Sequence, residues 1–196
     1  GAQSASLPRP GLHRPLVDTV RPPLATRPTP ARVDALLPRS RIVAFYGNPL
    51  SRRMGILGEL DPEPMMARLD SVAAAWTAAD SAHAVRPALH LIVTVAQADS
   101  GNDGMYRLRH GDALIRRVAD WAASRGWLLF LDIQPGRSPV LAEVERLVPW
   151  LQRPEVHLAI DPEFTMPAGQ VPGRRIGTID AATINAVVAR LGALVD

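Results

Sequence analysis

The residues best suited to chemistry in this chain are three acidic side chains, each placed where a short apolar run ends. Asp132 lies near the end of the run 127–136, and Asp161 and Glu163 close the run 156–164. Side chains alternate between the two faces of a strand, so Asp161 and Glu163 are expected on one strand face, with Asp132 nearby. The carboxyl ends of buried parallel strands are where α/β proteins keep their reactive groups. The pattern predicts a carboxylate site at one rim of a sheet.

Paired carboxylates of this kind are typical of glycoside hydrolysis. That reaction uses two carboxyl groups about 5 Å apart for retention, or about 6.5–9.5 Å apart for inversion. Neighbouring strands lie ~4.8 Å apart, so a pair formed by Asp132 and Glu163 fits either separation. Crowding also raises the pKa of one carboxyl group, as an acid catalyst requires. We therefore expect Glu163 to act as the acid/base, with Asp132 or Asp161 as its partner.

Two other interpretations of the same acids stay open. Acids at strand ends also serve a purely structural purpose, capping the next helix or pairing with a loop arginine. The candidate arginines are Arg137, Arg174 and Arg175. The acids also suit a non-catalytic cell-envelope protein that binds a glycan or another small polar ligand without turning it over. A structural assembly protein is a further alternative for the chain.

Further residues at the same rim are candidate contacts for a carbohydrate or another small polar ligand. They are Tyr46, Asn48, Glu59, Gln97, Gln134 and Arg137. Tyr46 equally suits core packing, and Glu59 equally suits a solvated loop. The position of Gln97 along its run groups it with the apolar Val93 and Val95, which argues against a ligand contact.

Other kinds of site have little support. The chain has no cysteine, and its histidines show no HExxH spacing, so no metal site is predicted. His157 is expected to be a satisfied core histidine. The segment DSGNDG at 99–104 resembles part of a calcium loop but lacks the distal glutamate, and a turn is expected there. There is no Walker loop and no GxGxxG, so no cofactor is predicted.

The charge of the chain is divided unevenly. Residues 1–41 hold seven arginines against two aspartates, a balance of +5, whereas residues 42–196 hold 15 arginines against 17 acids, a balance of −2. Residues 1–40 also hold eight of the 19 prolines and are predicted to form an extended tether. Because the body has no basic stripe, nucleic acid is not an expected partner. No apolar run approaches the ~20 residues of a membrane span.

The body, residues 41–196, alternates strand and helix four times. The expected strands cover 42–48, 89–97, 127–136 and 156–163, and the expected helices cover 62–82, 111–125, 138–152 and 181 onward. Repeated βα units predict a parallel sheet with right-handed crossovers. Four units are half of a TIM barrel, so we expect a TIM-barrel-like half or truncated barrel, completed by a second chain or a second copy. The alternative is a small, doubly wound open sheet.

Several segments resemble a known group of proteins: FYGNP, LDIQPG, AIDPEF and the stretch PAGQVPGRRIGTIDAATIN. The group consists of exported bacterial proteins described only as lipoproteins or hypothetical proteins, whose architecture resembles the glycoside-hydrolase type of TIM barrel. The resemblance covers residues 41–196 but not the predicted tether, residues 1–40. It implies an exported or envelope-associated protein, further βα units beyond residue 196, and hence a chain that is truncated or cleaved. It implies no assigned activity.

Overall fold

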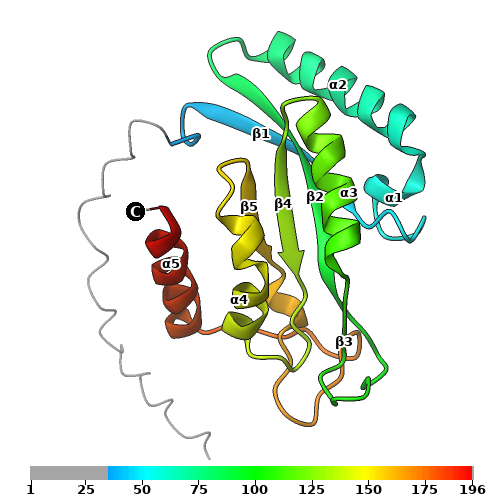
Figure 1. The fold of residues 1–196 in the computed structure, drawn as a ribbon, viewed down its shortest axis with the longest axis vertical. Coiled ribbons are helices and arrows are strands. Elements are labelled where there is room, and N and C mark those ends of the chain that lie inside the picture. The colour runs from blue at the N-terminus through cyan, green and yellow to red at the C-terminus, as the bar shows by residue number, and fades with distance from the viewer. Residues whose placement is uncertain (1–34, 196) are drawn as a thin grey trace, which may run out of the picture. The chain divides into compact units, whose positions relative to one another are not determined.

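The domain is built on a sheet whose longest strands all run parallel. The computed structural model describes residues 35–195 (Figure 1). The strands are β1 (Ser40–Gly47), β2 (Ala84–Ala96), β3 (Arg107–Arg109), β4 (Leu128–Ile133) and β5 (Val156–Ile160). They are ordered β1–β2–β4–β5, and the short β3 pairs antiparallel with the end of β2. The helices are α1 (Ile56–Glu59), α2 (Pro62–Ala79), α3 (Asp112–Ser124), α4 (Val140–Leu151) and α5 (Ala181–Val195). The predicted parallel sheet and alternating βα units are confirmed.

Local sequence signals set the helix ends. Pro62 occupies the first turn of α2, where its missing N–H would have had no partner. Gly126 follows the end of α3 with φ 63°, a left-handed conformation that glycine adopts without a steric cost. Pro149 lies inside the last turn of α4, and the helix continues past it to Leu151.

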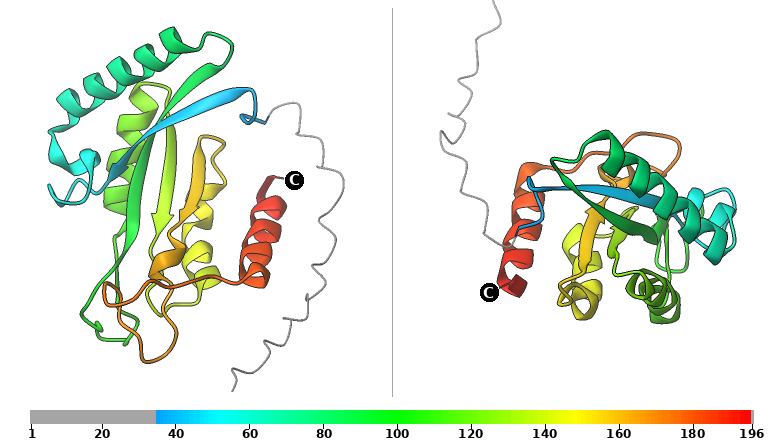
Figure 2. Two further views of the ribbon diagram at one scale, coloured as in Figure 1. Left: turned by 180° about the vertical axis from the view of Figure 1, so that it is seen from behind. Right: turned by 90° about the horizontal axis from the view of Figure 1, so that it is seen from above.

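All the α-helices pack on one face of the sheet. The main hydrophobic core joins buried side chains of α2, α3 and α4 to every second residue of the strands, such as Leu89 and Leu91 in β2 and Leu129 and Leu131 in β4. The view from above in Figure 2 shows α3 and α4 on the same side of the sheet. The opposite face carries the side chains that alternate with these core residues along each strand, and no described α-helix packs against it. We call it the helix-free face.

The sheet is open and forms no closed barrel within residues 35–195. In this respect it agrees with the alternative expectation of an open sheet. A doubly wound fold would also carry helices on both faces, and the single core cluster does not have that arrangement. Strands β1 and β5 each have one neighbour in the described chain and lie at the two edges.

The end of the fourth predicted strand differs from the structure. The fourth strand was expected to reach Glu163, but β5 ends at Ile160 and a 3-10 turn covers Pro162–Phe164. The prediction that Asp161 and Glu163 share a strand face is therefore wrong. The physical reason is Pro162, which cannot donate a hydrogen bond to a strand and begins a helical turn instead.

The remaining differences concern the segment after β2 and the ends of the chain. The segment 98–111, expected as a loop, contains β3. The chain divides into two units, residues 1–34 and 35–196. Residues 1–34 of the predicted tether lie outside the described residues. Among the described helices, none combines the length and apolar character needed to cross a bilayer.

Candidate functional site

A row of ring side chains crosses the helix-free face from one edge of the sheet to the other. Tyr46, His90, Phe130 and His157 stand directly opposite one another on β1, β2, β4 and β5. Their ring centroids are separated in turn by 4.9, 5.7 and 5.1 Å. The strand register pairs these residues directly, and residues paired across neighbouring strands point to the same face of the sheet. The row forms an aromatic platform beneath the strand ends.

Asp132 lies beyond this platform, on β4, and is completely buried. Its Oδ2 lies 3.1 Å from Nε2 of His90, and the two side chains share a hydrogen bond. Its Oδ1 has no hydrogen-bond partner within residues 35–195. Burial raises the pKa of Asp132, the hydrogen bond from His90 opposes that shift, and the nearby charges of Asp161 and Glu163 add to it. Asp132 is therefore a carboxyl group that retains its proton to a higher pH than usual.

Asp161 follows β5 directly and is half-buried. Its Oδ2 accepts hydrogen bonds from the Tyr46 hydroxyl at 3.2 Å and from Nε2 of Gln134 at 3.0 Å. The side-chain oxygen of Gln134 accepts a bond from the backbone N–H of Ala96 at 3.1 Å, which fixes the orientation of its amide. Burial and the negative charges of Asp161 and Asp132 raise the pKa of Tyr46, so its hydroxyl remains a donor.

Glu163 is exposed on the 3-10 turn beyond β5. It lines an open hollow of about 250 Å³ together with Phe164, Arg174, Arg175 and Ile176. The backbone N–H of Gly177 donates to the Glu163 carbonyl at 2.6 Å and fastens the following loop to this turn. The charge of Glu163 is close enough to raise the pKa of Asp132, although its side chain lies outside the network of Asp132 and Asp161.

The other predicted ligand contacts are divided between the network and the surrounding loops. Tyr46 and Gln134 join the two aspartates. Asn48 is buried and supports backbone instead, since its amide donates to the Ile92 carbonyl at 3.0 Å and its oxygen accepts from the Leu50 N–H at 2.9 Å.

Gln97, Glu59 and Arg137 lie in the segments that follow strands. Gln97 comes just after β2, where its backbone N–H donates to the Tyr106 carbonyl at 2.9 Å. Glu59 is exposed at the end of α1. Arg137 lies over the Tyr106 ring at 4.1 Å and donates to the Gln170 carbonyl at 2.8 Å. These three side chains have no hydrogen bond to Asp132 or Asp161 within the described part of the chain.

Two histidines of the platform were not predicted as site residues. His90 has a signal in the sequence, since it shares parity with Ala88 and Ile92 and so faces away from Leu89 and Leu91. His157 was expected to be a satisfied core residue, but its Nε2 is buried without a hydrogen-bond partner among residues 35–195. Burial lowers the pKa of His157 and favours its neutral form.

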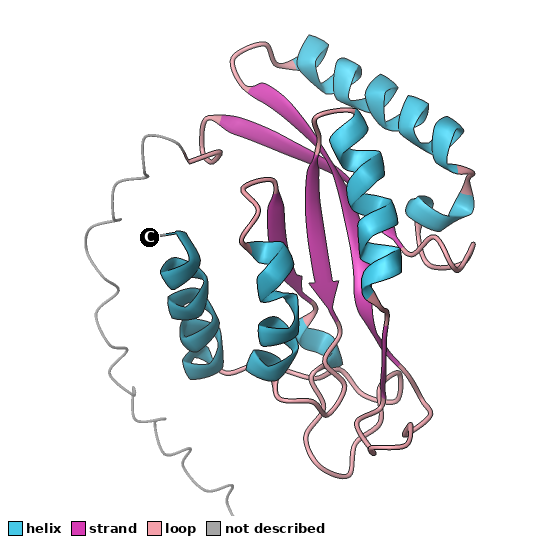
Figure 3. Cartoon of the chain, viewed as in Figure 1, coloured by secondary structure: helices cyan, strands magenta, loops and turns pink. Residues whose placement is uncertain are grey.

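The loops that follow β2, β4 and β5 gather at the same end of the sheet (Figure 3). Backbone contacts tie them together: the N–H of Met166 donates to the Gly136 carbonyl at 2.7 Å, and the N–H of Arg137 donates to the Met105 carbonyl at 2.8 Å. Gly136 has φ 60°, and a Cβ at this position would lie 2.4 Å from the Met105 carbonyl oxygen. The rim above the two aspartates is therefore a preformed set of loops.

Arginines do not pair with these two aspartates within the described part of the chain. The arginine contacts expected of a structural acid are instead made by Glu143 of α4, which is fully buried. Its carboxylate binds Arg109 at 2.6 Å, Arg107 at 3.1 Å and Arg146 at 3.4 Å. This cluster attaches β3 to α4.

Neither a metal centre nor a known relative defines the site. Residues 35–195 contain no group of three or more histidine, aspartate or glutamate side chains placed to hold a metal ion. No protein-family model, curated protein or solved structure matches the chain. The chemistry of the side chains is therefore the basis for assigning a function.

Proposed function

We propose that the helix-free face carries an acid–base site directed at carbohydrate, of the kind used by glycoside hydrolases, in an exported protein. The observation that carries the proposal is the pairing of Asp132, a buried carboxyl group with a raised pKa, with the hydrogen-bonded Asp161 at the end of the adjacent strand. Glycoside hydrolysis needs one carboxyl group that keeps its proton and a second that is ionised.

The two acids take different roles in this proposal. Asp132 is fully buried, so its proton reaches a ligand through His90, whose side chain is 24% exposed. Asp132 passes its proton to Nε2 of His90 while the imidazole gives its Nδ1 proton to the leaving-group oxygen, so His90 stays neutral and Asp132 becomes a carboxylate as the glycosidic bond breaks. Asp161 accepts a proton from the water molecule that attacks the anomeric carbon. Tyr46 and Gln134 hold Asp161 in place through its Oδ2.

The platform gives the site a surface for a sugar ring. Aromatic rings pack against the apolar faces of sugars, and polar groups at the rim bind the hydroxyls. Tyr46 is 36% exposed, while Phe130 and His157 extend the surface across the sheet. This assignment moves the acid role away from Glu163, which lies on the exposed 3-10 turn.

Substitution of Asp161 tests the proposal on a panel of labelled glycans. Asp161→Asn is expected to lower turnover at least about a hundredfold, the usual contribution of a positioned general base. Asp120→Asn, on the exposed surface of α3, is the matched control and should leave turnover unchanged. Glu163→Gln separates the two assignments: a hundredfold loss in that variant, with Asp161→Asn fully active, would overturn the roles proposed here.

A second candidate function is binding of the same ligand without turnover. It is favoured by the hydrogen bonds that Asp161 Oδ2 already accepts from two donors, which leave it less available as a base. If the parent protein binds glycans in isothermal titration but hydrolyses none of the panel, binding is the function. Loss of turnover with binding retained in Asp161→Asn supports catalysis.

We further propose that the four parallel strands are half of a TIM-barrel-like sheet, completed by a second chain or a second copy. Support comes from the free edges of β1 and β5, from helices restricted to one face, and from exposed apolar side chains on α5, where Val188 is 61% exposed and Val195 is 62% exposed. Sedimentation of the chain at micromolar concentration tests the second copy. A purely monomeric species would leave a different chain as the completing partner.

A further inference from the structure

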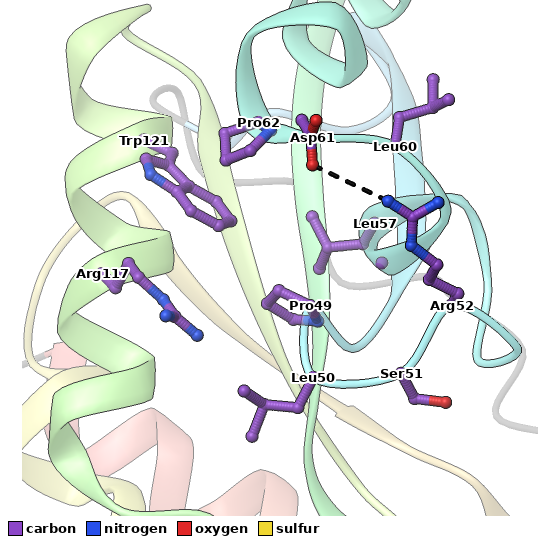
Figure 4. A pocket seen from close by; sticks show the side chains of 11 residues that line it. Pro49, Leu50, Ser51, Arg52, Leu57, Leu60, Asp61, Pro62, Arg117 and Trp121 are labelled. Atoms are coloured by element: carbon purple, nitrogen blue, oxygen red, sulfur yellow. Dashed lines mark ion pairs between the residues drawn. The ribbon is translucent and has the colours of Figure 1, made fainter.

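A separate cavity of about 400 Å³ opens on the helix side of the sheet. It lies between the loop after β1, the start of α2 and one side of α3 (Figure 4). None of its lining residues belongs to the platform or to the network of Asp132 and Asp161. Its volume falls in the range of sites for small molecules.

The walls of this cavity combine polar and apolar side chains. Pro49, Leu57 and Pro62 face Trp121 of α3, as Figure 4 shows. Leu57 is 1% exposed and closes the cavity on the core side, whereas Leu50 is 60% exposed at its edge. Trp121 packs partly against the core, so its ring is held in place.

Backbone hydrogen bonds and close packing hold the β1–α1 loop, which forms one wall of the cavity. The N–H of Asn48 donates to the Met54 carbonyl at 2.9 Å, and the N–H of Ser51 donates to the Asn48 carbonyl at 3.0 Å. Gly58 approaches this loop so closely that a Cβ would lie 2.1 Å from the Asn48 carbonyl oxygen. The cavity is therefore preformed, which reduces the ordering cost of binding.

Arg117 is one of three charged side chains that line the cavity, with Arg52 and Asp61. It projects from α3 one turn before Trp121, and its guanidinium lies 5.7 Å from the Trp121 ring centroid. Within residues 35–195 it forms no ion pair. The other arginine, Arg52, lies 3.9 Å from Asp61, and this ion pair is weak because both side chains are largely exposed. The cavity thus combines an aromatic wall with a guanidinium that lacks a carboxylate.

The start of α2 restricts which anion fits. Helix N-termini bind phosphate through several free backbone N–H groups. Here Pro62 and Pro64 remove two of the donors of the first turn. A carboxylate needs only the paired donors of one guanidinium, whereas a phosphate would find too few partners.

We propose that this cavity binds an organic carboxylate with an aromatic or similarly flat apolar body. The carboxylate pairs with Arg117, and the apolar body packs against Trp121, Pro49 and Pro62. The guanidinium is planar and matches a carboxylate with two parallel hydrogen bonds. The proposal does not depend on the function proposed for the helix-free face.

Isothermal titration with 2-naphthoate tests the proposal, with neutral 2-naphthamide and inorganic phosphate as comparison ligands. The parent protein is expected to bind 2-naphthoate with a Kd of about 1 mM or tighter. Arg117→Met keeps the apolar stem but removes the charge, and it should weaken 2-naphthoate binding about tenfold with little effect on 2-naphthamide. Arg116→Met is the matched control, because Arg116 is its exposed neighbour on α3 and does not line the cavity.

The possible results of these titrations distinguish a carboxylate site from the alternatives. A selective loss in Arg117→Met, together with weaker binding in Trp121→Leu, supports the carboxylate site. Equal affinity for acid and amide, equal losses in both arginine variants, stronger binding of phosphate, or no binding of 2-naphthoate would each overturn it. Thermal unfolding of the variants shows whether a lost signal reflects the site or the fold.

Discussion

Asp132 and Glu143 are both fully buried acids, yet their surroundings shift their pKa values in opposite directions. Asp132 has one imidazole partner, one oxygen without a partner in the described residues, and two neighbouring acids. Glu143 is surrounded by Arg107, Arg109 and Arg146. Burial alone favours the neutral acid at both positions. At Glu143 the hydrogen bonds from Arg109 and Ser138 and the charges of the arginines reverse that preference.

The largest expected effect is the loss of the Glu143 charge. Glu143→Gln leaves three arginines around a neutral amide and should lower the free energy of unfolding by about 3 kcal/mol at pH 7. Urea unfolding followed by circular dichroism measures the change. Glu145→Gln is the control on the same helix, since Glu145 pairs with a single arginine on the surface.

The pH dependence of the Glu143 effect follows from its lowered pKa. Its stabilising contribution is present above the ordinary value of 4.5 and is lost as the pH falls through the folded-state pKa. The difference between parent and Glu143→Gln should therefore shrink in acid. A difference that stays constant from pH 7 to the acid range would contradict the assignment of the stabilising charge to Glu143.

A smaller effect of opposite sign is expected for Asp132→Asn. The pKa of Asp132 is raised, so its ionisation costs stability once the pH rises above the ordinary value of 3.8. Asparagine has the same shape without the charge, so this variant should be more stable than the parent by about 1 kcal/mol at pH 8, and the gain should fade in acid. Urea unfolding at several pH values measures it. A loss of stability at pH 8 comparable to that of Glu143→Gln would remove the contrast between the two acids.

The smallest effect concerns Tyr46, the donor to Asp161. The chain has two tyrosines, and burial together with the adjacent aspartates raises the pKa of Tyr46 above the ordinary value of 10.0. A spectrophotometric titration should therefore show one phenol that ionises late, and Tyr46→Phe should remove that late step. Tyr46→Phe removes the hydrogen bond donated to Asp161 and the one accepted from Gln134, and the loss of these long, partly exposed bonds should change stability by about 0.5–1 kcal/mol. Tyr106→Phe is the control that keeps the late step.

Part of this site can be predicted from strand periodicity. Alternation along 127–136 places Asp132 and Gln134 on the face opposite Leu129 and Leu131, and the structure has that arrangement. The same rule applied to β2 would have selected His90, but a single histidine in an apolar run gives no indication of its partner. The hydrogen bond to Asp132 depends on β2 and β4 being neighbours, which is a property of the sheet order.

Most contacts of Glu143 cannot be predicted from the sequence. Arg146 is three residues away on the same helix, and that pair follows from helical spacing. Arg107 and Arg109 come from β3, 36 and 34 residues away, in a segment that was expected to be a loop. Glu163 shows the reverse case, because Pro162 was a local sign that the strand ends before it.

The sequence by itself determined the alternation of strands and helices, the parallel direction of the strands and the positions of the two aspartates near strand ends. These features depend on period, chain direction and local turn residues, which are all local properties. Only the tertiary structure decided that the described α-helices lie on one face, that Asp132 meets His90, and that Glu143 meets three arginines. Those outcomes depend on which residues, distant in the sequence, are buried next to one another. Burial and the neighbouring charges then set whether each acid is ionised.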